Sequence, residues 1–499
     1  MNNNILINPN EIVEFIGKPA QSFTREDIVR FIEARKISTI DFRYAAEDGK
    51  LKSLSFVPRD SDHLESILTA GERVDGSSLF SFVESGSSDL YVIPKYRTAF
   101  VNPFAATPTL EILCSFYDYH GKPLESSPEY ILRKAHAHFK EKTGYRLKAF
   151  GELEYYVKSV HDDLYPLVEQ KGYHQAKPFS KFEDLRTKAL ELCTKAGCSI
   201  KYGHSEVGSY TENGEDFEQH EIEFLPVDPE EAVDQLLVSK WILRMLAYQH
   251  KVEVSFAPKI TVGEAGSGMH FHMLLEKNGQ NVMITDGHLS DIAKSMIAGI
   301  LDLSRALTAF GNTIPTSYLR LVPHQEAPVK ICWGDRNRSA LVRVPLGWNE
   351  SMNMIRDANP MDSTELHDVP TNQTVEIRSP DGSANIYMLL AGLLVAIEHG
   401  LEMHQSSEVA EKLYVDYNVF RDTKRNHKKL DSLPYSCWES ANALIEKRDI
   451  LEKDGVFPSR VIDSVAARLK SFNDRGLRER LHNDKEETGK IVREFLHCG

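Results

Sequence analysis

The sequence predicts an α+β fold divided into two domains. The chain has 499 residues, which is too long for one small domain and long enough to bury large cores. Its first part mixes short helical stretches with alternating, strand-like runs, whereas the remainder carries strands between long helices. Helix-breaking residues between 121 and 130 separate the two patterns. We therefore expect a small N-terminal domain over residues 1–125 and a larger domain over residues 126–499.

A helix, a hairpin and a loop are expected in the N-terminal domain, in that order. Residues 25–37 form a helical stretch. Residues 37–58 alternate apolar and polar side chains around a turn signal at Asp48 and Gly49, which predicts a β-hairpin. Residues 75–94 are rich in glycine and serine, which predicts a loop.

Four long helices and a helical C-terminal segment are expected in the larger domain. Ser127 and Asp228 each precede a proline, so each is expected to be the N-cap of a helix that begins with that proline. Residues 290–312 predict a third helix, which ends near a glycine. Residues 383–403 predict a fourth helix, which is apolar on nearly all sides and therefore buried. From Ser459 onward the pattern predicts exposed helices that pack on the body of the domain.

Composition and charge argue against several classes of partner. The formal net charge of −14 disfavours nucleic acid or an anionic membrane as the main partner. The first 15 residues do not resemble a secretory signal, and the most apolar stretch, residues 387–397, is too short to span a bilayer. The six cysteines are scattered without a Cys-x-x-Cys pair, which predicts buried thiols in a reducing compartment. We expect a cytoplasmic protein.

Polar side chains recur two residues apart in four strand-like runs, and the residue between them is apolar each time. Residues i and i+2 of a β-strand point to the same face. The pairs are Glu152 and Glu154, Glu221 and Glu223, His270 and His272, and Glu376 and Arg378. One interpretation is four strands whose polar faces meet water. The other is a cleft in which divalent cations neutralise carboxylates that would otherwise repel one another. Carboxylates with one imidazole suit Mg²⁺ or Mn²⁺.

An arginine-rich segment supplies groups that such a cleft could use. Arg320, Arg336, Arg338 and Arg343 lie close together in the sequence, with Glu326 in an intervening loop. Guanidinium groups pair with phosphate and carboxylate oxygens. Alone, the segment is typical of a solvated surface, but beside a two-metal cleft it favours phosphoryl transfer. The chain has no Walker loop and no Gly-x-Gly-x-x-Gly motif, so any nucleotide is expected to be held by metals and the sheet.

Seven motifs now carry a resemblance to a known family. They are VDGSS, GELEYYV, SEVGSY followed by QHEIEF, GSGMHFHM, SYLRLVPHQEAPV, RNRSALVRVP and VEIRSPDGSAN. In this order, from about residue 40 to about residue 475, the chain resembles bacterial class I glutamine synthetases. The resemblance implies a β-grasp N-terminal domain and a catalytic domain with a curved antiparallel sheet and flanking helices. It also implies a dodecamer of two hexameric rings, with active sites between subunits that make glutamine from glutamate, ammonia and ATP through γ-glutamyl phosphate.

Matching the motifs residue by residue implies a role for each candidate. Glu154, Glu206 and Glu221 would hold one metal, and Glu152, His270 and Glu376 the other. His272 and Arg343 would contact ATP, Gly266 and Arg320 would bind glutamate, and Arg338 and Arg378 would hold the transferring phosphoryl group. Glu326 would lie on a flap that excludes water from the acyl phosphate. Asp75, from the adjacent subunit, would deprotonate ammonium in a pocket completed by Ser78, Tyr173, Glu206 and Glu326.

The chain departs from the family pattern around the nucleotide and the glutamate. Ala265 replaces an asparagine, Leu274 a serine, Pro226 an aromatic residue and Thr371 a lysine. The phosphate end of the site is therefore better supported than the base end. We also expect no nucleotidylation of Tyr414, because the residues around it differ from the family's modification motif.

Three functions are compatible with these residues. The first is glutamate–ammonia ligation, the second is a ligase that joins glutamate to a larger amine, and the third is a non-catalytic assembly or regulatory relative. Asp75, Ser78 and Tyr173 match the ammonium pocket, which favours the first over the second. All six implied metal ligands are present, which disfavours the third.

Overall fold

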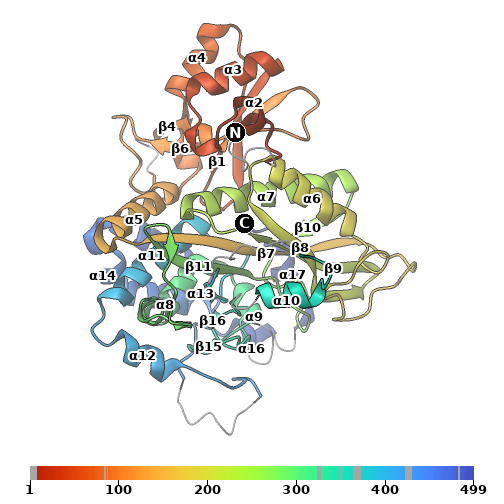
Figure 1. Cartoon of the computed structure of the whole chain (residues 1–499), viewed down its shortest axis with the longest axis vertical. Coiled ribbons are helices and arrows are strands. Elements are labelled where there is room, and N and C mark those ends of the chain that lie inside the picture. The colour runs from red at the N-terminus through yellow and green to blue at the C-terminus, as the bar shows by residue number, and fades with distance from the viewer. Residues whose placement is uncertain are drawn as a thin grey trace.

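Two β-sheets, each with its own helices, organise the chain. The computed structural model describes residues 8–83, 86, 88–322, 327–347, 351–363, 372–421, 430–481 and 484–499. Figure 1 shows the N-terminal sheet and its helices at the top and the larger sheet and its helices below. This arrangement confirms the predicted α+β class, whereas the domain boundary near residue 125 stays a prediction.

The N-terminal sheet contains six strands in the described residues, in the order β2-β1-β6-β4-β3, with β5 beside β6. β1 and β6 are parallel, and the other neighbours are antiparallel. The strands are β1 (Thr39–Ala45), β2 (Leu51–Phe56), β3 (Glu72–Asp75), β4 (Asp89–Pro94), β5 (Phe100–Val101) and β6 (Thr109–Tyr117). The helices are α2 (Glu11–Ile16), α3 (Arg25–Arg35) and α4 (Ser61–Ala70), which share one apolar core with the sheet.

The structure confirms two of the N-terminal predictions and corrects the third. Helix α3 occupies the expected helical stretch, and β1 pairs with β2 as a hairpin whose turn contains Gly49 with a φ of +76°. The segment expected to be a loop, residues 75–94, ends in strand β4. Leu90 and Val92 alternate there and are buried in the N-terminal core, and the glycine- and serine-rich residues before them obscured this alternation.

The larger sheet contains nine strands in the described residues, in the order β15-β16-β17-β11-β7-β9-β8. β10 pairs with β7 and β12 with β11, and every pair is antiparallel except β15 with β16. The strands are β7 (Arg146–Val160), β8 (Ile200–Glu212), β9 (Glu215–Phe224), β10 (Glu253–Ser255), β11 (Met269–Lys277), β12 (Gln280–Asn281), β15 (Trp333–Asp335), β16 (Val342–Val344) and β17 (Val375–Ile377). β13 (Ile284–Thr285) and β14 (His288–Leu289) form a separate hairpin.

Helices cover one face of this sheet. Leu153, Tyr155 and Ile222 on that face belong to the largest apolar core, together with residues of α5, α7, α8 and α11. The helices are α5 (Pro128–Thr143), α6 (Glu183–Lys195), α7 (Pro229–His250), α8 (Asp291–Gly311), α9 (Ser317–Arg320), α10 (Ser351–Ala358), α11 (Ile386–Glu402), α12 (Ser406–Leu413), α13 (Cys437–Glu446), α14 (Arg448–Leu451), α15 (Ser459–Ser471), α16 (Leu477–Leu481) and α17 (Lys485–Phe495).

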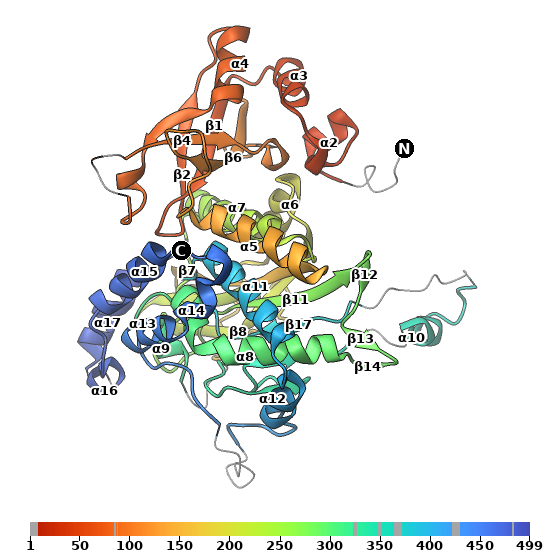
Figure 2. The ribbon, with the colours of Figure 1, turned by 90° about the vertical axis from the view of Figure 1, so that its left-hand side faces the viewer.

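The helix predictions for the larger domain are confirmed. α5 and α7 begin at the expected prolines, α8 ends at Gly311, and α11 is buried on nearly every side. Ser127 and Asp228 occupy the N-cap positions of the first two helices, but neither side chain makes a capping hydrogen bond, and the Asp228 carboxylate pairs with Arg146. α15, α16 and α17 form the C-terminal helical segment, which Figure 2 shows at one side of the larger domain.

Two further expectations concern membranes and thiols. Within the described residues no single helix has the length and apolarity to cross a membrane, although α11 and α12, bent by 112° at their junction, meet those criteria as a pair. All six cysteines are free thiols, and five are buried as predicted. Cys498 is partly exposed, which corrects the prediction for that residue.

Candidate active site

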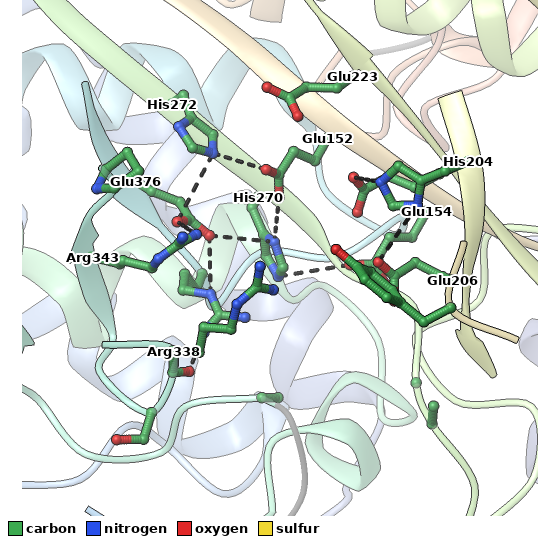
Figure 3. A pocket seen from close by; sticks show the side chains of 18 of the residues that line it. Glu152, Glu154, His204, Glu206, Glu223, His270, His272, Arg338, Arg343 and Glu376 are labelled. Carbon is green, nitrogen blue, oxygen red and sulfur yellow. Dashed lines mark hydrogen bonds and ion pairs between the residues drawn. The ribbon is translucent and has the colours of Figure 1, made fainter. Parts of the chain in front are cut away.

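A cavity of about 840 Å³ lies on the polar face of the larger sheet, opposite the helix-covered face. Strands β7, β8, β9, β11 and β17 all contribute side chains to it, as Figure 3 shows for the labelled residues. Thirteen predicted site residues line this one cavity: Glu152, Glu154, Tyr173, Glu206, Glu221, Gly266, His270, His272, Arg320, Arg338, Arg343, Glu376 and Arg378. The structure thus brings together most of the residues that the sequence implicated.

Strand register explains why these residues meet. His270 on β11 lies opposite Glu152 on β7, and His272 lies opposite Glu376 on β17. On the other side of β7, Glu154 lies opposite Glu221, which in turn lies opposite His204 on β8. Because directly opposed residues of antiparallel strands point to the same face, the polar pairs form one continuous array across five neighbouring strands, β17, β11, β7, β9 and β8.

Both histidines of the GSGMHFHM motif contact the same carboxylate. His270 Nδ1 lies 2.7 Å from Glu152 Oε2, and His272 Nε2 lies 2.9 Å from Glu152 Oε1. Burial disfavours the charged form of Glu152, but the charge of His272 and hydrogen bonds from both imidazoles hold its pKa well below the usual range. Burial lowers the pKa of His270, whereas Glu152 raises that of His272 against the effect of burial. Glu152 therefore has both imidazoles as partners, and the pKa values of the two histidines are shifted in opposite directions.

Two arginines balance the charge of Glu376, which lies at the β17 end of the array. Arg343 Nη1 lies 2.8 Å from Glu376 Oε2, and Arg378 Nε lies 3.0 Å from Glu376 Oε1. Burial opposes ionisation of Glu376, but the charge of Arg378 lowers the pKa below its ordinary value. Arg378 follows β17 and does not belong to it, which corrects its expected place in a strand. It is held there by donating to the carbonyl oxygen of Arg338.

The middle of the array carries an excess of negative charge. Burial and the neighbouring carboxylates of Glu152, Glu154, Glu206 and Glu223 raise the pKa of Glu221 well above its ordinary value. The possible metal-ligand atoms of the array form three overlapping groups, and within each group the atoms lie within 4.8 Å of one another. The groups are Glu152 with His270 and Glu376, His204 with Glu206 and Glu221, and Glu152 with Glu221 and Glu223. Oxygen-rich groups with one imidazole and uncompensated charge fit hard divalent cations such as Mg²⁺ or Mn²⁺.

Glu154 contacts the glycine-rich loop before β11. Its Oε2 accepts hydrogen bonds from Gln219 Nε2 at 3.0 Å and from the backbone N–H of Gly268 at 2.7 Å. A Cβ at Gly268 would lie 2.6 Å from Arg320 Nη2 and 2.7 Å from His270 Nε2. Glycine is therefore required here because the backbone passes directly beside the two side chains.

Arg320 is 4% exposed and lines the cavity, where its guanidinium is anchored by hydrogen bonds. Its Nη1 donates to the carbonyl oxygen of Ser379 at 2.9 Å, and its Nη2 lies 3.4 Å from His270 Nε2. A Cβ at Gly266 would lie 3.0 Å from Arg320 Cγ, so the loop packs against the arginine stem. This contact places the guanidinium next to the metal-ligand candidates.

Asp75 and Ser78 are not among the described residues that line the cavity. They lie in the N-terminal domain, where the Ser78 and Ser77 hydroxyl groups each lie 2.7 Å from an Asp75 carboxylate oxygen. Hydrogen bonds from Ser78 and Ser77 hold the pKa of Asp75 well below its usual range, so the carboxylate is ionised at neutral pH. Their role at a neighbouring subunit's site stays a prediction.

The residues at which the chain departs from the family pattern, together with Glu326, do not share one location. Glu326 and Thr371 lie outside the described residues. Pro226 and Ala265 line the cavity, and Leu274 is 5% exposed within the core. The aromatic ring of Phe150 stacks on His272 with centroids 4.7 Å apart.

Sequence reasoning missed His204 and Lys201, two polar residues that line the cavity. His204 faces Glu221, and Lys201 Nζ lies 2.5 Å from Glu223 Oε1. His204 and Glu206 were detectable, because they show the same two-residue spacing as the other pairs. The Lys201–Glu223 contact joins two strands and depends on their register, which the sequence does not state.

Comparisons with known proteins agree with this geometry. Residues 36–119 match the family model "Glutamine synthetase, beta-Grasp domain", and residues 125–486 match "Glutamine synthetase, catalytic domain". A glutamine synthetase from Thermotoga maritima is 30% identical over 438 residues, covering 86% of this chain and 91% of the relative. A 3-hydroxylaminophenol mutase from Cupriavidus pinatubonensis is 28% identical over 476 residues, covering 88% of this chain and 93% of the relative. The fold is similar to that of Plasmodium falciparum glutamine synthetase, with a TM-score of 0.74 at 18% identity over 93% of this chain and 100% of the other.

Proposed function

This chain belongs to the glutamine synthetase family, and from that premise we propose that it is a glutamate–ammonia ligase. In the proposed reaction the γ-phosphoryl group of ATP is transferred to the side-chain carboxylate of L-glutamate, and ammonia displaces phosphate from the resulting γ-glutamyl phosphate, which gives L-glutamine, ADP and phosphate. The observation that carries the proposal is the shared cavity, in which a carboxylate–imidazole array faces a set of arginines. Such an array suits phosphoryl transfer to a carboxylate, because both reactants are anions that need neutralisation.

The carboxylates and imidazole are proposed to hold two divalent cations, Mg²⁺ or Mn²⁺. One centre would use Glu206 and Glu221 with Glu154, and the other Glu152, His270 and Glu376. Divalent cations there would neutralise the phosphate oxygens of ATP during transfer.

The arginines are proposed to bind the anionic groups of glutamate and ATP. Arg320 would pair with the α-carboxylate of glutamate, because it is fixed beside the glycine loop at Gly266. Arg338 and Arg378 would hold the phosphoryl group as it moves, and Arg343 and His272 would contact the nucleotide. A planar guanidinium can donate two parallel hydrogen bonds to each anionic group.

The amine half of the site is proposed to be completed by a second subunit. Asp75 and Ser78 lie on the N-terminal domain and away from the cavity of their own chain. In a dodecamer of two hexameric rings they would meet the neighbouring cavity near Tyr173. The ionised Asp75 would bind ammonium there and accept its proton as the nitrogen attacks the acyl phosphate. The flap role of Glu326 is part of the same proposal.

A ligase for a larger amine is the second candidate. Tyr173 and Tyr202 line the cavity and are 48% and 44% exposed, so aromatic surface is available to pack the carbon chain of an amine. One similar chain is named as a mutase, so relatives of this chain have activities other than ammonia ligation. The non-catalytic alternative has no such observation in its favour.

The proposal is tested by measuring ADP release from Mg²⁺-ATP in the presence of L-glutamate. The assay is run without amine, with ammonium and with a panel of primary amines. Glu152→Gln, which removes a charge from the array, is expected to lose activity, and Glu141→Gln on the exposed face of α5 is the matched control. Ammonium-dependent ADP release with glutamine as product would support ammonia ligation. Release only with a larger amine would move the assignment to the second candidate. A folded, metal-binding protein without turnover would overturn both.

A further inference from the structure

His204 is absent from the ligands that the resemblance implies, yet its ring completes one group of ligand atoms. The imidazole, the Glu206 carboxylate and the Glu221 carboxylate each place a ligand atom within 4.8 Å of the others. Figure 3 shows His204 on the same side of the cavity as Glu206 and Glu154. The side chain is 14% exposed, so the ring is largely withdrawn from bulk solvent.

The local backbone directs these side chains into the cavity. His204 on β8 pairs with Glu221 on β9, but the register shifts between Ser205 and Ser209. Three residues of β8, from Glu206 to Gly208, therefore face a single residue of β9. Such bulges re-aim side chains and are common beside functional sites.

The hydrogen bond on one ring nitrogen determines what the other nitrogen can do. His204 Nδ1 lies 3.1 Å from the carbonyl oxygen of Ser205, which can only accept, so this nitrogen carries a hydrogen. Nε2 then faces Glu221 Oε1 at 3.2 Å. Metal-binding histidines are commonly oriented in this way, with one N–H donated to a backbone carbonyl and the other nitrogen directed at the metal. Neighbouring rings fix the plane, because the centroids of His174 and Tyr173 lie 4.4 and 5.6 Å from that of His204.

We propose that His204 Nε2 is a ligand, together with Glu206 and Glu221, of the divalent cation at this end of the array, and that it favours Mn²⁺ over Mg²⁺ there. The inference deepens the proposed function by naming a metal preference, and it rests on the metal chemistry proposed above. Mg²⁺ is held mainly by oxygen ligands and keeps its water, whereas first-row transition metals accept imidazole nitrogen more readily. With His270 beside Glu152 and Glu376, two of the ligand groups in the array each contain one imidazole.

Metal affinity measured without substrates tests this inference. Mn²⁺ and Mg²⁺ are titrated into metal-free, full-length wild type, His204→Asn and His404→Asn. His404 is the matched control, because it is an exposed histidine that is not among the cavity-lining residues. His204→Asn is expected to weaken one class of Mn²⁺ site by on the order of tenfold to a hundredfold and to lower the ratio of Mn²⁺ to Mg²⁺ affinity. An unchanged ratio in His204→Asn, or an equal change in His404→Asn, would overturn the proposal.

Nitrogen coupling to bound Mn²⁺ gives a second readout that does not depend on turnover. In His270→Asn, spin-echo spectra are expected to retain ¹⁴N coupling from His204, and the coupling is expected to disappear in His270→Asn/His204→Asn. No coupling in the single variant, or coupling that survives in the double variant, would overturn the proposal. Glutamine synthesis is measured separately, so a protein that binds Mn²⁺ through His204 but makes no glutamine would refute the proposed reaction and retain the ligand assignment.

Discussion

Glu221→Gln should stabilise the metal-free protein and abolish part of its stabilisation by metal. Glu221 is 7% exposed and has ligand oxygens within 4.8 Å of those of Glu152, Glu206 and Glu223. At that distance each carboxylate pair repels by about 3.5 kcal/mol at an effective dielectric constant of about 20. Lys201 Nζ lies 2.5 Å from Glu223 Oε1 and offsets part of this repulsion, so the net cost to the metal-free folded state is on the order of one such pair, about 3 kcal/mol.

The pH dependence of this effect has a definite sign. Folding raises the pKa of Glu221, so the folded state binds more protons and the wild type loses stability as pH rises above about 4.5 towards the raised pKa. Glutamine has no such titration. The variant should therefore exceed the wild type by up to about 3 kcal/mol at pH 7 and by much less at pH 5.

Urea unfolding in EDTA, at one protein concentration and at both pH values, measures the difference. A Mg²⁺ concentration of about 100 times Kd should add about 2.7 kcal/mol to the wild type through each site it fills, and less to the variant. Glu141→Gln, on an exposed helix face, should match the wild type throughout. A variant that is less stable than the wild type in EDTA at pH 7 would refute the argument that this array carries uncompensated charge.

Three further predictions concern single positions. Gly268→Ala should lower kcat by on the order of a hundredfold, because a Cβ 2.6 Å from Arg320 Nη2 and 2.7 Å from His270 Nε2 displaces both side chains. Gly489→Ala on helix α17 is the control and should leave kcat unchanged. Equal kinetics in the two variants would contradict the predicted clash. Asp75→Asn should raise the KM for ammonium without changing Mn²⁺ affinity, and an unchanged KM would remove Asp75 from the amine site. Tyr414 should carry no nucleotide in protein from its native cells, and a nucleotidylated peptide in mass spectrometry would contradict this.

Side-chain alternation allowed much of the site to be predicted from the sequence. The spacing of two residues fixes which face a polar side chain occupies, whatever its partners are, so Glu152 and Glu154 could be assigned to a common face. The helices were predictable for a similar reason, because prolines at the first helical position and a uniformly apolar stretch are local signals.

The parts that could not be predicted depend on relations between strands. Glu221 lies between Glu154 and His204 only because β9 has one register with β7 and another with β8. The shift at residues 206–208 is a property of the pair of strands and leaves no simple trace in either one. Arg378 was expected within a strand because the alternation continues past Ile377, where the pairing of β17 ends.

The same register that assembles the array also protects it. On β7 and β9 the cavity-facing carboxylates alternate with Leu153, Tyr155 and Ile222, which are fully buried in the apolar core. A slip of one residue would move the carboxylates into that core and the apolar side chains into the cavity, because the period of a strand is two. Burying an unpaired charge is far more costly than the repulsion within the array, which a cation can relieve. The proposed cation site and the unique pairing of the sheet therefore have a common origin in the placement of the glutamates.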